Sequence, residues 1–240
     1  MLYLRMFVTL AISFYTSRVV LQALGVSDYG IYNVVGGVIV MISTLTGALG
    51  GATSRFLTYA LGKNDPENLK TTFSTAFYIH LALAILFVVV AESVGVWFVN
   101  TQLVIPEGRM GAANWVFQAV IVSTALGMTQ VPYSASITSH EKMAAFAYIA
   151  ILDAVIKLGI AFVVLISPTD HLKLYSILLM AMSVGFQLYY RFYCIRHFDE
   201  CHITRRFDRR IFREMLSFSG WSMVGSLSLM FKNQGTNIII

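Results

Sequence analysis

The chain has 240 residues, of which 57% are hydrophobic and only 12% are charged, and its mean hydropathy is +0.71. This composition excludes an ordinary soluble domain, because one core cannot bury so much apolar surface, and it indicates a bundle that has lipid as its main solvent. The net charge of +5 does not indicate nucleic-acid binding, since no aromatic-interleaved basic module accompanies it.

Seven apolar segments of near-spanning length follow one another along the chain. Each approaches the ~20 residues that a helix needs to cross about 30 Å of hydrocarbon, and none shows the alternation of barrel strands. We therefore predict an all-α integral membrane protein with about seven transmembrane helices, at residues 6–24, 31–52, 73–94, 115–135, 144–166, 174–193 and 216–240.

Short sequences rich in Gly, Pro, Ser and Asp separate these spans and read as turns. They lie at residues 25–28, 61–66, 106–108, 139–141 and 167–170. We expect a six-helix lobe over residues 1–194, a basic cytoplasmic connector over 195–214, and the first helix of a second, truncated lobe over 215–240. The connector is expected to form a short surface helix through Arg205, Arg206, Arg209, Arg210 and Arg213.

The orientation of the chain follows from its lysines and arginines. Most of the 17 lie in the N-terminal segment and in the even-numbered connections, which share one side of the membrane. The positive-inside rule therefore predicts a cytoplasmic N-terminus. Trp97 and Trp115 then lie at the outer interface and Trp221 at the inner one, as an aromatic belt requires.

Motifs for catalysis or for a metal are missing from the sequence. Cys194 and Cys201 are predicted to be free thiols on the cytoplasmic side, and their spacing with His197 and His202 matches no common zinc pattern. No HExxH motif, paired-aspartate nucleotide-sugar site or Ser/His/Asp arrangement is recognisable. We therefore predict a protein that is not an enzyme and that has no cofactor.

Ionisable residues inside the spans are candidate functional residues, because each costs several kcal/mol unless it faces protein, water or a partner. Arg18 lies near the outer end of the first span and could either snorkel to the interface or line a polar cavity. Asp153 and Lys157 lie four residues apart in the fifth span. This pair could neutralise itself, or one member could engage the substrate or a coupling ion, for which H⁺ and Na⁺ are the candidates.

The last span carries four polar side chains in its outer half, which is too many for a helix that faces lipid. They are Lys232, Asn233, Gln234 and Asn237, and we expect them to face a polar interior. Buried cations around a cavity would attract an anionic lipid-linked substrate.

Five stretches of this sequence resemble the polysaccharide exporters, or O-antigen flippases, of the multidrug/oligosaccharidyl-lipid/polysaccharide superfamily. The resemblance covers nearly the whole chain and matches the N-terminal half of the family pattern. The stretches are SRVVLQALGVSDYGIYNVVGG (17–37), SRFLTYALGKND (54–65), AESVGVWFVNTQLVIPEGRMGAANWVFQ (91–118), PYSASITSHEKMAAFAYIAILDAVIKL (132–158) and FSGWSMVGSLS (218–228).

The resemblance implies a transporter with two six-helix lobes around a central cationic cavity. Such a transporter turns an undecaprenyl-diphosphate-linked oligosaccharide across the bacterial inner membrane, with membrane lipids and glycan polymerase machinery as further partners. Arg18, Arg55 and Lys157 match basic positions of the family, and together with Lys232 they form the expected substrate-binding set. The alternatives are a drug or cation antiporter of the same superfamily, a membrane-embedded glycan-processing enzyme, or a nonfunctional fragment.

Overall fold

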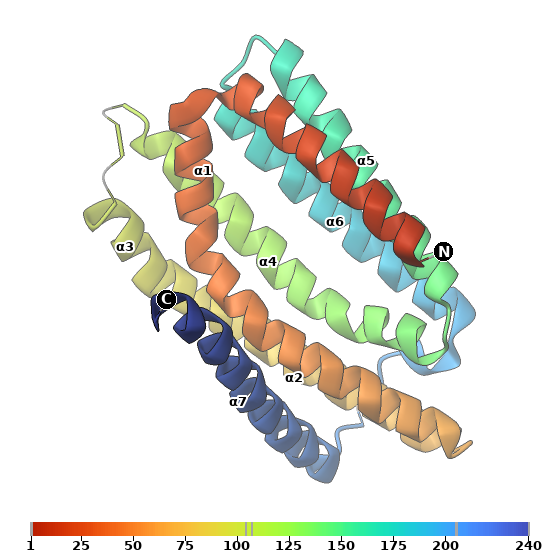
Figure 1. Cartoon of the computed structure of the whole chain (residues 1–240). Helices are drawn as coiled ribbons and strands as arrows, with labels where there is room; N and C mark the ends of the chain where they lie inside the picture. Colours follow the sequence, from red (N-terminus) through yellow and green to blue (C-terminus); the bar gives the residue numbers. More distant parts are fainter. Residues whose placement is uncertain (1, 104, 107, 205, 240) are drawn as a thin grey trace.

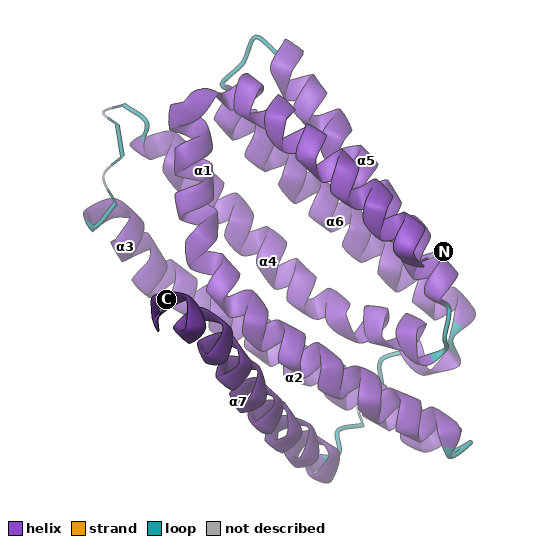
Figure 2. Ribbon diagram, viewed as in Figure 1, coloured by secondary structure: helices purple, strands orange, loops and turns teal. Residues whose placement is uncertain are grey.

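The structure, a computed structural model, describes the backbone of residues 2–103, 105–106, 108–204 and 206–239, and the side chains of all of these except 2–5, 38–45, 223 and 226–239. Regular structure in the described residues is helical throughout (Figure 2), which confirms the all-α prediction. The elements are α1 (Leu2–Gly62), α2 (Pro66–Val90), the π-helical turn η1 (Ala91–Gly95), α3 (Val96–Thr101), α4 (Met110–Ser139), α5 (Met143–Ile166), α6 (His171–His197), the 3-10 turn η2 (Asp199–Cys201) and α7 (Arg209–Ile239).

The long helix α1 contains the first two predicted spans, which meet at a break at Gly25. The φ of Gly25 is 74° and its ψ is 169°, a conformation that glycine adopts without the steric cost of a side chain. Figure 1 shows the two parts of α1 running in different directions from this point. We call residues 2–24 the first arm and residues 26–62 the second arm. The predicted turn at residues 25–28 is thus a break at one residue.

Five segments of the described residues are long and apolar enough to cross a membrane, which is what a multi-pass membrane protein requires. The second arm beyond Gly37 and the last part of α7 include side chains outside the described residues, but their backbone is helical where the second and seventh spans are predicted. The five segments are Met6–Gly37, Pro66–Thr101, Met110–Ser139, Met143–Ile166 and His171–His197.

The helix α4 packs in the middle of the bundle, against α1, α2 and α6. In Figure 1, α5 and α6 lie on one side of it, whereas α7 lies on the other side against α2 and the second arm. We call the end of the bundle that holds the Gly25 break the kink end, and the opposite end, with residues 63–65, 140–142, 198–204 and 206–208, the basic end. Each end has its own buried cluster, with Val116 and Leu172 toward the kink end and Phe73 and Tyr133 toward the basic end.

The connector between α6 and α7 corrects one expectation, because the described part of the arginine-rich run forms no separate surface helix. Side chains of α2 bind its backbone instead: Ser74 Oγ accepts a hydrogen bond from the Thr204 amide at 3.0 Å, and Thr75 Oγ1 accepts one from the Asp208 amide at 3.2 Å. These partners hold residues 202–204 and 206–208 in a non-helical path, since the backbone groups of these residues do not bond to one another in helical register.

The start of α7 is fixed by Asp208. Its Oδ1 atom accepts a hydrogen bond from the Arg210 amide at 2.7 Å, as the side chain of an N-cap residue does. Arg209, Arg210 and Arg213 therefore belong to the first turns of α7, whereas Arg205 lies outside the described residues.

Candidate functional site

A polar cavity of about 860 Å³ lies between the first arm of α1 and the helices α4, α5 and α6. Residues from near the basic end, such as Met6 and Phe146, line one part of it, and Tyr32 and Ser176 line the part nearest the kink end. Its uncharged polar lining includes Thr9, Ser13, Thr16, Ser17, Ser123, Gln130, Ser176, Ser183 and Tyr190.

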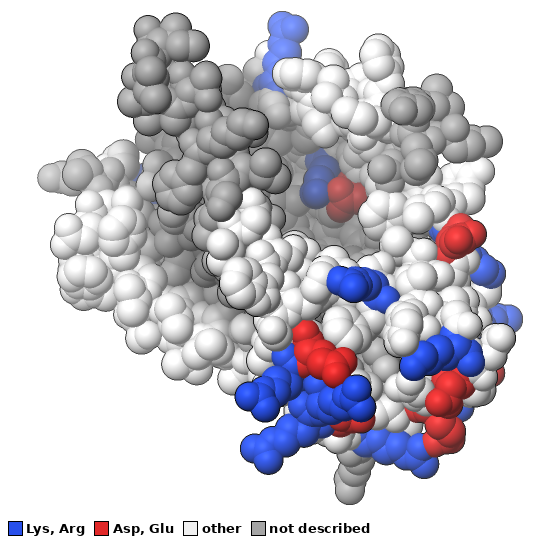
Figure 3. Space-filling view, turned by 60° about the horizontal axis from the view of Figure 1, so that its bottom comes forward, with Lys and Arg blue, Asp and Glu red and all other residues white. Residues whose placement is uncertain are grey.

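Asp153 and Lys157 are the charged residues among those that line this cavity. The Lys157 Nζ atom lies 2.8 Å from Asp153 Oδ2, and both side chains are more than one third exposed, at 46% and 37%. The space-filling view shows a hollow of largely uncharged atoms with one basic and one acidic side chain in it (Figure 3). The cavity therefore contains charge at its wall but has no net formal charge.

The hydroxyl groups of the cavity wall mostly donate to the backbone of their own helices. Thr16 donates to the Ile12 carbonyl at 2.8 Å, and Ser183 donates to the Leu179 carbonyl at 3.0 Å. Ser17 and Ser176 make equivalent bonds within their helices. A hydroxyl that has given its only proton to the backbone retains two lone pairs. The wall is thus rich in hydrogen-bond acceptors and suits ligands that donate, such as sugar hydroxyls, or small cations.

A second concave site, a groove of about 1230 Å³, lies between the second arm of α1 and the start of α7. The guanidinium of Arg55 lies 4.4 Å from the centre of the Phe218 ring. Arg213 and Trp221 also line the groove, and so does Glu214, which accepts a hydrogen bond from Arg210 at 2.9 Å. We call this site the arginine groove, since its lining combines two guanidinium groups with aromatic rings.

The structure brings only some of the predicted site residues together. Asp153 and Lys157 meet in the polar cavity, and Arg55 lies in the arginine groove on the other side of the bundle. Arg18 is exposed on the first arm and does not line either site. The side chains of Lys232, Asn233, Gln234 and Asn237 lie outside the described residues. The predicted cationic set is therefore not gathered in one cavity by the described part of the chain.

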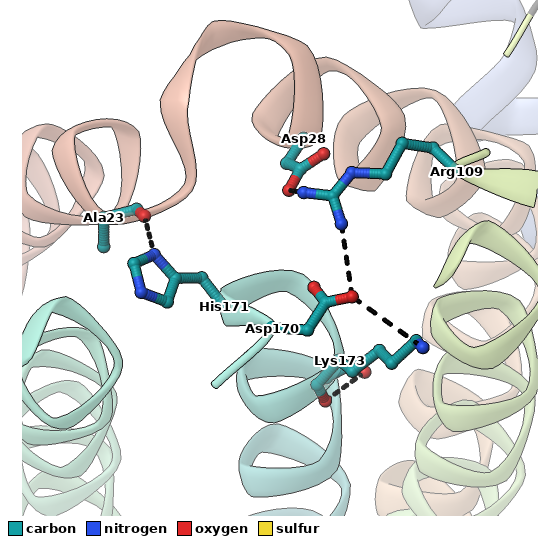
Figure 4. A network of polar contacts seen from close by, with 7 residues as sticks. Ala23, Asp28, Arg109, Asp170, His171 and Lys173 are labelled. Atoms are coloured by element: carbon teal, nitrogen blue, oxygen red, sulfur yellow. Dashed lines mark hydrogen bonds and ion pairs between the residues drawn. The ribbon is translucent and has the colours of Figure 1, made fainter. Parts of the chain in front are cut away.

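A network of charges at the kink end was missed by the sequence interpretation. Figure 4 shows the Arg109 guanidinium between two carboxylates, with Nη2 paired to Asp28 and Nη1 3.2 Å from Asp170 Oδ2. Lys173 Nζ lies 3.8 Å from the same Asp170 oxygen, and Asp28 is 4% exposed. The sequence did contain a signal for this network. Three of the predicted turns, all on the same predicted side of the membrane, carry or adjoin residues of opposite charge, namely Asp28, Arg109 and Asp170.

The basic end holds two further polar groups, a histidine–glutamate pair and a pair of cysteines. His140 Nε2 lies 2.6 Å from Glu200 Oε1, and the His140 ring stacks on Phe198 with the ring centres 4.2 Å apart. Cys194 and Cys201 are free and buried. The pKa of the Cys201 thiol lies well above its ordinary value, chiefly because of a hydrogen bond with Cys194 and secondly because the thiol is buried. This sulfur therefore stays protonated and is a poor nucleophile.

No protein-family model, curated protein or solved structure matches the chain. The functional interpretation therefore depends on the cavity, the arginine groove and the charges that line them.

Proposed function

We propose that this chain belongs to a transporter that moves an anionic, lipid-linked oligosaccharide across a membrane. The polar cavity carries the proposal. Asp153 and Lys157 lie within about 4 Å of the midpoint of α5 along its axis, which is the costliest depth for charge in a bilayer. A charged pair at that depth, beside a cavity large enough for a small ligand, is typical of a substrate or ion pathway.

The arginine groove is the proposed site for the diphosphate of the substrate. Guanidinium groups bind phosphate oxygens in a bidentate manner, and Arg55 already lies on an aromatic ring that limits its rotation. The pairing of Glu214 with Arg210 leaves Arg55 and Arg213 as the guanidinium groups of the groove that can neutralise a ligand. Trp221 and Phe218 give the groove aromatic walls.

The polar cavity is the proposed site for groups that donate hydrogen bonds. Sugar hydroxyls can donate to the lone pairs that Thr16, Ser17 and Ser183 present, and aromatic residues such as Tyr190 offer surface for sugar rings. Protonation of Asp153, or Na⁺ bound to it, would release Lys157 from its ion pair, so we propose Asp153 as the site of the coupling ion.

The proposed location is the bacterial inner membrane, with the basic end and the N-terminus in the cytoplasm. Lys63, Lys142, Arg196 and Arg206 belong to the basic end, where Figure 3 also shows most of the visible charge gathered. A concentration of Lys and Arg at one end of a bundle supports this orientation through the positive-inside rule.

A lipid-binding assay on the purified full chain tests the proposal. A short polyprenyl diphosphate is titrated while the fluorescence of Trp221 is followed, and a Trp221→Phe variant identifies the part of the signal that arises in the groove. Arg55→Ala should weaken binding about tenfold, equivalent to about 1.4 kcal/mol. Arg196→Ala, an exposed arginine outside the groove, is the matched control and should bind like the parent chain. No binding by the parent, or equal losses in the two variants, contradicts the proposal.

An exporter of organic cations is a second candidate, because the acceptor-rich wall and Asp153 also suit a cationic ligand. This candidate predicts that an organic cation binds in the polar cavity and that Asp153→Asn abolishes its binding. The polyprenyl diphosphate would then not bind at the groove. Measuring both ligands on the same protein distinguishes the two functions.

A further inference from the structure

His171, the first residue of α6, lies between two backbone carbonyl groups at the kink end. Its Nδ1 atom is 2.6 Å from the Ala23 oxygen and its Nε2 atom is 2.9 Å from the Ser167 oxygen. A carbonyl oxygen can only accept a hydrogen bond, so each ring nitrogen must donate. A neutral imidazole has one N–H group and the imidazolium ion has two. The two hydrogen bonds can therefore form together only when the ring is protonated.

The two carbonyl groups belong to helix ends that have lost their regular partners. Ala23 is two residues before the break at Gly25, where the helical hydrogen-bond ladder of α1 is interrupted. Ser167 directly follows the last residue of α5. His171 thus joins the end of the first arm to the end of α5, from its own place at the start of α6. Figure 4 shows the ring pointing at Ala23, across from the charged network.

Four charged side chains surround His171. Asp28 on the second arm is close enough to interact electrostatically with His171, and Asp170 is its neighbour in the chain. Asp170 Oδ1 is buried and has no hydrogen-bond partner among the described residues. Arg109 before α4 and Lys173 on α6 are the opposing cations, and both lie against Asp170. Two carboxylates therefore face three cations when His171 is charged.

The network lies directly beyond the end of the polar cavity. Ser176 follows His171 by five residues, or about 7.5 Å along α6, and Tyr32 follows Gly25 by seven residues, or about 10 Å along the second arm. Both residues line the cavity. The Tyr32 and Tyr175 rings meet edge to face between the cavity and the network, with centres 5.2 Å apart.

We propose that His171 and the ion pairs of Arg109 form a proton-operated latch that closes the kink end of the polar cavity. The protonated ring ties the first arm, α5 and α6 together. Loss of its proton places a nitrogen lone pair against a carbonyl lone pair, which repels, and the kink end loosens. Histidine is suited to this role because it changes charge between about pH 5 and pH 8. The latch does not depend on which substrate the cavity binds.

Cysteine labelling from the kink end tests the latch. Ser176→Cys places a reporter thiol behind the latch, and Val26→Cys, at a position 82% exposed beside the break, places a reference thiol in front of it. A membrane-impermeant thiol reagent is added to intact cells and to inverted vesicles, and the side that labels Val26→Cys is the kink-end side. Dividing the Ser176→Cys rate by the Val26→Cys rate corrects for the reagent's own pH dependence. The native cysteines are buried, so their background is small.

The latch predicts that this ratio rises about tenfold from about pH 5.5 to about pH 8, equivalent to about 1.4 kcal/mol. His171→Gln should give a high ratio at both pH values, and His171→Lys, which keeps a permanent charge, should give a low ratio at both. His202→Gln, an exposed histidine at the basic end, is the control and should behave like the parent. A pH-independent ratio in the parent, or a pH dependence that survives His171→Gln, overturns the latch.

A direct measurement of the ring covers the case in which the His171 variants do not fold. Nitrogen-15 NMR of the parent chain, labelled in its five histidines, distinguishes rings with one and with two protonated nitrogens. One ring should lose a proton over the same pH range in which labelling increases. Labelling that changes while all five rings keep their protonation state contradicts the proposal.

Discussion

The polar cavity and the arginine groove handle charge in opposite ways. In the cavity, Lys157 is paired with Asp153 on the same helix, and most hydroxyl protons are taken by the backbone. In the groove, Arg55 lies on an aromatic ring, and the carboxylate of Glu214 is already paired with Arg210. The charges inside the cavity thus neutralise each other, whereas the face between α1 and α7 keeps excess positive charge at its surface.

The largest effect in this comparison should come from breaking the pair inside the cavity. Asp153→Ala leaves Lys157 unpaired near the middle of α5, and an unpaired lysine at the centre of a membrane helix costs about 2.5–3.5 kcal/mol on insertion scales. Because the cavity exposes both side chains, we expect a loss of about 2 kcal/mol in the free energy of unfolding. Unfolding by a denaturing detergent measures the change.

The double variant Asp153→Ala/Lys157→Ala is the matched control. It removes both charges and should recover at least half of the loss, so that a double-mutant cycle gives a coupling of about 1 kcal/mol. Additive losses would mean that the two charges act independently, and the neutral description of the cavity would then be wrong.

The second prediction tests whether the helices that surround the cavity are tightly packed against one another. A Cβ atom on Gly95, in the π-turn η1, would lie 2.5 Å from the tip of the Phe117 ring, and Phe117 is 1% exposed. Gly95→Ala should therefore displace a buried ring and destabilise the protein by about 1–2 kcal/mol. Gly111→Ala on α4 is the control, since a Cβ there meets open space and the change should be neutral or stabilising. Equal unfolding midpoints for the two variants would show that the ring moves freely.

A smaller effect distinguishes charge from geometry in the arginine groove. Arg55→Lys keeps the charge but loses the planar fork and the stacking on Phe218, so the affinity for a polyprenyl diphosphate should fall about threefold, less than for Arg55→Ala. Titration of the two variants beside Arg196→Lys measures the difference. If Arg55→Lys binds like the parent, the groove supplies only positive charge.

The helices were predictable because hydropathy and turn residues are local signals. The described residues of all seven predicted spans lie on helices, and the Asp153–Lys157 pair follows from a spacing of four residues on one helix. The kink-end network was not predictable in the same way. Arg109 lies 81 residues from Asp28 and 61 from Asp170, so the packing of three turns against one another decides whether they meet.

The same limit explains the connector and the arginines. The path of the connector at Thr204 and Asp208 depends on Ser74 and Thr75, which are 130 and 133 residues away from the amides that they bind. For Arg18, the sequence left open whether its side chain points into the cavity or toward the surface. The neighbouring Ser17 lines the cavity and Arg18 does not, because successive helical residues point about 100° apart.

The smallest effect should come from Arg18, because its side chain lies on the exposed surface of the bundle. Arg18 is exposed and lies outside both sites, so Arg18→Gln should change the free energy of unfolding by less than about 0.5 kcal/mol. Binding of a polyprenyl diphosphate at the groove should also stay within about twofold of the parent, equivalent to about 0.4 kcal/mol. A loss of transport in Arg18→Gln without a loss of groove binding would place Arg18 on the substrate's path at a step that follows binding. A loss of binding as large as that of Arg55→Ala would instead mean that both arginines contact one ligand. The arginine groove between α1 and α7 would then be only part of the binding site.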